Sequence, residues 1–167
     1  MKKKVLYAVL LTGIAAIVSS CAFLFSSTHK MVLDENNPAE KNVLITFSND
    51  TSDGWFIVKQ CNGKDIYNDL YPDDNIGSED KTQLTVPAGD NSFTFDVRYT
   101  YNSRYSSTTY KVEDIELQYF LEAGKEYKIM GNTKSLGFFK GDELFVEIYD
   151  VTKDSTLLKE WKVGETS

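Results

Sequence analysis

Residues 92–101 read Ser-Phe-Thr-Phe-Asp-Val-Arg-Tyr-Thr-Tyr, and this stretch decides the fold class. Every odd position from 93 to 101 is apolar or aromatic, whereas every even position from 92 to 100 is polar or charged. Successive side chains of a β-strand point to opposite faces of the sheet, so this alternation predicts a strand with one buried and one exposed face.

The segments on either side of this stretch show short runs of the same kind. Asn62-Gly63 predicts a two-residue hairpin, because both central positions of that turn take positive φ. A helix beginning after Ser155 is the alternative for residues 156–161. Turns at a spacing of about ten residues predict an all-β fold, a single antiparallel β-sandwich of about 7–9 strands. The further expected strands cover residues 43–48, 55–61, 64–67, 82–86, 110–121, 126–130, 144–148 and 157–163.

The composition excludes several classes of function. The 167 residues suit one domain. Eighteen Lys and Arg against 25 Asp and Glu give a formal charge of -7, which argues against nucleic acid as a partner. A single His excludes metal sites built from several His, and the chain points to no cofactor.

The N-terminal segment has the form of an export signal. Residues 2–4 are lysines, residues 5–18 are apolar except for Thr12 and Gly13, and small residues follow. A helix over these 14 residues reaches about 21 Å, which is short of a hydrocarbon core about 30 Å thick.

Val18-Ser19-Ser20-Cys21 resembles the lipobox of bacterial lipoproteins, with Val18 where Leu is commonest. The resemblance implies cleavage between Ser20 and Cys21, and a Cys21 thiol that carries diacylglyceryl, so that acyl chains such as palmitate bind membrane lipid. Ala22, where an Asp would favour the inner membrane, favours the outer membrane of the cell envelope. Two alternatives stay open: an uncleaved anchor helix over residues 5–25, and a plain secretory signal with an incidental Cys.

The predicted organisation has four parts. Residues 1–20 are the signal peptide, residues 21–41 a lipidated flexible tether, residues 42–163 the β domain, and residues 164–167 a tail. Removing residues 1–20 takes away three Lys and no acidic residue, so the formal charge of the mature chain becomes -10.

Two turns share a form, Val86-Pro87-Ala88-Gly89-Asp90 and Leu121-Glu122-Ala123-Gly124-Lys125. Each places Ala-Gly between an apolar strand end and a strand that carries aromatic residues. This form resembles the small PEGA-like and transthyretin-like β-sandwich modules of bacterial lipoproteins. The resemblance implies a fold and no activity.

No catalytic residues are predicted. His29 falls in the expected tether, and Cys61 is a lone thiol that we interpret as a small apolar residue at a strand end. The acidic loop over residues 71–80 offers oxygen ligands for Ca²⁺, but their spacing is not that of an EF-hand, so a solvated loop is the favoured interpretation. Those candidate ligands are Asp73, Asp74, Asn75, Glu79 and Asp80.

The segment over residues 99–110 combines Tyr, Ser, Asn and Arg, a composition typical of binding loops. Its candidate contacts are Tyr101, Arg104, Tyr105 and Tyr110; the alternative is that the tyrosines pack on the sheet. We therefore expect a lipid-anchored, non-catalytic envelope protein whose domain serves binding or envelope assembly, with an unidentified envelope protein or glycan as its partner. The rivals are a carbohydrate-active enzyme that uses the acidic-loop carboxylates and a Ca²⁺-stabilised surface module.

Overall fold

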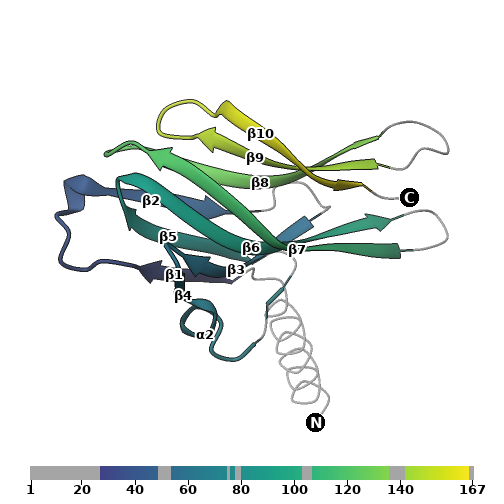
Figure 1. The fold of residues 1–167 in the computed structure, drawn as a ribbon, viewed down its shortest axis with the longest axis horizontal. Coiled ribbons are helices and arrows are strands. Elements are labelled where there is room, and N and C mark those ends of the chain that lie inside the picture. The colour runs from purple at the N-terminus through teal and green to yellow at the C-terminus, as the bar shows by residue number, and fades with distance from the viewer. Residues whose placement is uncertain are drawn as a thin grey trace, which may run out of the picture.

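The computed structural model describes residues 27–48, 54–74, 76–77, 80–102, 107–135 and 142–165. These residues form ten strands, one 3₁₀ turn at Ala39–Lys41 and one short helix, α2, at Tyr67–Leu70 (Figure 1). The strands are β1 (Thr28–Val32), β2 (Asn42–Phe47), β3 (Gly54–Cys61), β4 (Lys64–Asp65), β5 (Lys81–Pro87), β6 (Gly89–Asn102), β7 (Ser107–Leu121), β8 (Glu126–Ser135), β9 (Asp142–Asp150) and β10 (Thr156–Glu165).

The strands form two sheets, which confirms the all-β prediction. Sheet A has six strands in the order β1-β5-β2-β8-β9-β10, and sheet B has four in the order β4-β3-β6-β7. Figure 1 shows β6 and β7 of sheet B as one long hairpin, with β8, β9 and β10 of sheet A side by side at the green to yellow end of the chain.

The prediction of purely antiparallel pairing is wrong for sheet A. Strand β1 pairs with β5 in parallel, and so does β2 with β8. The reason lies in the connections, because parallel neighbours need a long crossover. Between β2 and β8 the chain builds all four strands of sheet B and also β5, which lies between β1 and β2 in sheet A.

The core lies between the sheets and is centred on aromatic rings. Phe47 of β2 lies edge-on against three rings of sheet B at centroid distances of 5.5–5.8 Å. These three rings belong to Phe56, Phe93 and Phe95. The odd residues 93–99 of β6 are each at most 2% exposed, which confirms the inward face that the alternation predicts.

Tyr99 links the two sheets through the core. Its hydroxyl donates a hydrogen bond to the carbonyl of Phe145 on β9 across 2.9 Å. Gly131 of β8 leaves room for the ring, because a Cβ atom there would lie 3.3 Å from Cε1 of Tyr99. Burial raises the pKa of the Tyr99 phenol above its ordinary value, so the hydroxyl stays protonated and remains a donor.

The hairpin prediction at Asn62-Gly63 is confirmed, with φ of 51° at Asn62 and 74° at Gly63. The expected strand over residues 64–67 is wrong beyond Asp65, because the chain turns into α2 and buries Ile66 and Leu70 in the core. The helix alternative for residues 156–161 is also wrong, since β10 pairs with β9 along its length and continues through Glu165.

The predicted tether is wrong over the residues that form β1. His29 and Met31 point inward and are half-buried, whereas Thr28, Lys30 and Val32 are exposed. Two inward residues are too few to produce a detectable period-two pattern, so this edge strand resembles a linker in the sequence. The sheet therefore begins well before residue 42.

Candidate functional site

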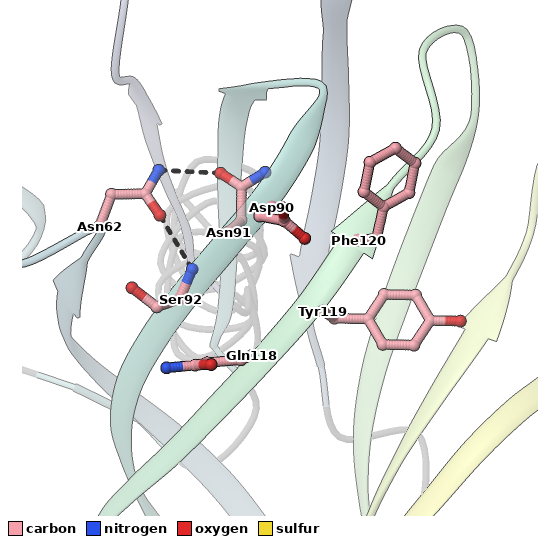
Figure 2. Close-up of a pocket in the computed structure, with 7 residues that line it drawn as sticks. All are labelled: Asn62, Asp90, Asn91, Ser92, Gln118, Tyr119 and Phe120. Carbon is pink, nitrogen blue, oxygen red and sulfur yellow. Dashed lines mark hydrogen bonds between the residues drawn. The ribbon is translucent and has the colours of Figure 1, made fainter.

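A shallow depression of about 470 Å³ opens where β6 begins and β7 ends, beside the β3–β4 hairpin. Figure 2 shows its side chains around these three elements. The lining residues are Asn62, Asp90, Asn91, Ser92, Gln118, Tyr119 and Phe120.

One wall of the depression is held rigidly by two asparagines. The Asn62 amide nitrogen donates to Oδ1 of Asn91 at 2.9 Å, and Oδ1 of Asn62 accepts from the backbone N–H of Ser92 at 2.8 Å. The Asn91 amide nitrogen in turn donates to the carbonyls of Pro87 and Gly89 at 2.9 and 3.0 Å. Asn91 is 4% exposed, so the hairpin tip is fastened to the start of β6 by a buried network.

The floor and the opposite wall carry polar groups that are free to bind. Asp90 faces Phe120 across the β6–β7 pair, and Ser92 faces Gln118. This register places the four side chains on the outer face of sheet B. Within the described residues, the side chains of Asp90, Ser92 and Gln118 form no hydrogen bond.

Phe120 supplies an apolar platform beside these groups. It is 59% exposed, more than any other large hydrophobic residue in the described part of the chain. Leu117 and Leu121, at odd positions of β7, are buried in the core. Phe120 lies at an even position, so its side chain points to the outer face of sheet B. An exposed ring beside a carboxylate, a hydroxyl and an amide can contact a ligand that has both C–H and O–H groups.

A second polar cluster on the same face is structural. Asp96 is 2% exposed, and its carboxylate accepts from Lys59 Nζ at 2.6 Å, Lys111 Nζ at 3.2 Å and the Asp114 backbone N–H at 3.0 Å. Burial acts to raise the pKa of Asp96, but these hydrogen bonds outweigh it and hold the pKa below its usual value. β-Bulges interrupt both flanking ladders here, between Val58 and Gln60 and opposite Phe95–Val97. Asp96 therefore joins two irregular strand segments.

The predicted binding loop is described only in part. Arg104, Tyr105 and the side chain of Tyr101 lie outside the described residues, so their role stays a prediction. Tyr110 is half-buried and packs against the core, as the alternative interpretation expected.

Two acidic residues of the loop over residues 71–80 are exposed to solvent, and a third, Asp80, holds the backbone through hydrogen bonds. Asp73 and Asp74 are exposed, and Asp74 accepts a hydrogen bond from the Tyr67 hydroxyl, whereas Asn75 and Glu79 lie outside the described residues. Asp80 instead accepts from the backbone N–H groups of Ser27 and Gly77, each at 2.7 Å. In the described part of the chain, no three His, Cys, Asp or Glu residues lie close enough together to hold a metal ion.

His29 belongs to the folded structure, so its placement in a solvated tether is wrong. Its Nε2 lies 3.3 Å from Asp80 Oδ2, and its ring centroid lies 4.8 Å from that of Tyr71. Asp80 thereby ties β1 to the end of the acidic loop.

Cys61 is fully buried, and burial raises the pKa of its thiol to about 12. The thiolate is therefore scarce at neutral pH, which agrees with the apolar role predicted for this residue.

Sequence reasoning missed the depression beside Phe120. One signal was present, because residues 115, 117, 119 and 121 form the apolar phase of that strand and Phe120 is an aromatic residue in the opposite phase. The position of Asp90 next to it follows from the β6–β7 register, which the alternation alone does not specify.

Within the described residues, no helix has the length and apolar character needed to cross a membrane. Comparison with protein-family models, with curated proteins and with solved structures finds no match to this chain.

Proposed function

We propose that this protein is a lipid-anchored protein of the cell envelope whose β domain binds a glycan non-covalently in the depression beside Phe120. The observation that carries the proposal is the convergence of Asp90, Ser92 and Gln118, all without hydrogen bonds in the described structure, next to Phe120, the most exposed aromatic ring among the described residues.

The chemistry of a sugar suits this arrangement. Pyranose rings present C–H groups on one face and hydroxyls around the edge. The C–H groups carry partial positive charge and pack on the negative face of an aromatic ring, here Phe120. The hydroxyls both donate and accept, which matches the carboxylate of Asp90, the amide of Gln118 and the hydroxyl of Ser92.

Rigid support favours binding at this site. The side chains project from paired strands, and the Asn62–Asn91 network fixes the wall before any ligand arrives. Little conformational entropy is then lost on binding, which improves affinity for a small polar ligand.

The depression offers less support for the enzymatic rival. Paired-acid glycoside hydrolysis needs two carboxyl groups about 5–9.5 Å apart. Asp90 is the one acidic residue among the seven that line the depression. We therefore propose binding without cleavage.

Glycan binding predicts a clear effect of the Phe120→Ala substitution. We expect Phe120→Ala and Gln118→Ala each to weaken binding at least about tenfold, equivalent to 1.4 kcal/mol, because each removes a direct contact. The measurement is screening of the full chain on an array of defined glycans, followed by calorimetric titration of the best one. Leu157→Ala, which removes an exposed side chain from β10 in sheet A, is the matched control and should bind as the wild type does. Failure to retain any glycan, or equal binding by Phe120→Ala, contradicts the proposal.

The anchor is proposed from the lipobox resemblance at Val18-Ser19-Ser20-Cys21, and the outer membrane from Ala22. A chain of formal charge -10 after cleavage is repelled by anionic lipid, so the acyl chains on Cys21 would supply the membrane attachment.

Cys21→Ser is expected to abolish incorporation of labelled palmitate, because it removes the thiol that takes the lipid. Metabolic labelling of cells that express the full chain measures this. Cys61→Ser controls for the loss of a thiol and should leave labelling intact. Labelling that persists in Cys21→Ser contradicts the anchor.

A further inference from the structure

The outer face of sheet B carries a second row of side chains, and two hydrogen-bond donors in it have no acceptor among the described residues. Trp55 of β3, Arg98 of β6 and Lys111 of β7 occupy one row across three strands, because Trp55 pairs with Arg98 and Arg98 pairs with Lys111. The guanidinium carbon of Arg98 lies 5.8 Å from the centroid of the Trp55 ring. This row is separate from the depression, since Arg98 lies six positions after Ser92 on β6, about 20 Å along the strand.

Two donors in this row have no acceptor in the described part of the chain. Nε1 of Trp55 and Nε of Arg98 are both buried, and neither has a hydrogen-bond partner among the residues that the structure describes. Arg98 also forms no ion pair within the described residues. Buried donors in folded proteins are nearly always paired, so two unpaired donors in adjacent side chains need an explanation.

The charges in the row point to a ligand of negative sign. Arg98 and Lys111 are like charges directly opposite each other, an arrangement that destabilises a sheet unless an anion lies between them. The positive charge of Lys111 is compensated by ion pairs with Asp96 and Glu113. Arg98 has no such carboxylate in the described structure, although the chain carries 25 acidic residues.

The positive charge of Arg98 also acts on Tyr67, the first residue of α2. The pKa of Tyr67 is raised, first by its hydrogen bond to Asp74 and then by burial, while the positive charge of Arg98 acts in the opposite direction. Trp55 and Arg98 are only half-buried as whole side chains, and Lys111 is exposed, so a ligand can approach the row from solvent.

We infer that Trp55, Arg98 and Lys111 bind an oxyanion, the carboxylate or phosphate group of a ligand. The guanidinium fork matches both groups through two parallel N–H···O bonds, and the Trp55 N–H and the Lys111 ammonium add donors. The indole ring beside the guanidinium gives the carbon skeleton of the ligand an apolar surface. A uronic acid and a phosphorylated glycan both have this chemistry.

The chain supplies its own reporter for this site. It contains two Trp residues, so Trp161→Phe leaves Trp55 as the only tryptophan of the full chain. In that background we would titrate sodium glucuronate and, separately, inorganic phosphate, with ionic strength held constant by sodium chloride. We expect a saturable change in Trp55 fluorescence with at least one of the two probes. Saturation by glucuronate alone assigns a carboxylate, by phosphate alone a phosphate, and by both an oxyanion in general.

Substitutions at Arg98 test whether it binds the anion, provided that each variant still folds. Arg98→Met should raise the dissociation constant at least tenfold, and Arg98→Lys, which keeps the charge but loses the fork, should raise it by a smaller factor. Lys64→Met, an exposed residue of β4, makes the same change in net charge and should leave binding unaltered. Circular dichroism checks that each variant folds, and Arg98→Lys keeps the test valid if Arg98→Met does not.

Three results would overturn the inference. The first is a fluorescence response that stays linear with both probes. The second is an equal response in the folded Arg98→Met or Arg98→Lys variants. The third is an equal response from Trp161 in a Trp55→Phe chain, which would show a general effect of the anions. None of these results bears on glycan binding at Phe120, so the two sites can fail separately.

Discussion

Phe47→Ala is expected to lower the free energy of unfolding by about 3–5 kcal/mol. Phe47 is 1% exposed and its ring meets three phenylalanines of the opposite sheet, so its removal leaves a cavity between the sheets. The cost combines lost burial of apolar surface with lost contacts around the cavity. Urea unfolding of the full chain, followed by circular dichroism, measures the difference.

Phe120→Ala provides the matched comparison for Phe47→Ala. It deletes the same atoms from an exposed ring, so the free energy of unfolding should change by no more than about 0.5 kcal/mol. Equal losses in the two variants would contradict the assignment of Phe47 to the core and of Phe120 to the surface.

Asp96→Ala is expected to lower the free energy of unfolding by about 3 kcal/mol. Removal of the carboxylate leaves two lysines without their shared partner and the Asp114 N–H without its acceptor. The loss falls at the low end for a buried ion pair, because Lys59 keeps Asp114 and Lys111 keeps Glu113. Glu113→Ala removes an exposed member of the same cluster and should cost no more than about 1 kcal/mol.

The contribution of Asp96 to stability has a defined pH dependence. Its pKa in the folded protein lies below the value of 3.8 expected when unfolded. The stabilisation is therefore complete well above pH 3.8 and disappears as the pH falls through the folded pKa, where the native carboxylate becomes protonated. Unfolding curves of wild type and Asp96→Asn should differ by a constant amount near neutral pH and converge in acid. A difference that grows on acidification would contradict the ion cluster.

The placement of Asp96 also bears on both proposed sites. Asp90, Asp96 and Arg98 lie on the outward face of β6, and the inward face of the same strand forms part of the core. A substitution such as Asp96→Ala should therefore disturb binding at both sites through the strand, whereas Phe120→Ala and Arg98→Lys act locally. This distinction guides which variants can be interpreted as binding defects.

Part of the candidate sites could be predicted from the sequence. The alternation over residues 92–101 already divides β6 into an inward aromatic face and an outward polar face, and the odd residues 93–99 are buried as predicted. Asn62-Gly63 predicts its own turn, since few other residue pairs accept positive φ at both positions. The N-terminal Lys residues, the apolar run and Cys21 form a local motif that needs no fold to be recognised.

The sequence by itself therefore determined the all-β class, most strand positions and the inward phase of the odd residues 93–99, because these follow from a backbone period that acts over neighbouring residues. The tertiary structure alone decided the parallel pairs in sheet A, the place of His29 in an edge strand, and the meeting of Trp55 with Arg98 and of Asp90 with Phe120. These contacts depend on strand order and register between distant segments. A shift of a single residue would turn every side chain of a strand to the other face, and packing of the whole core selects one register.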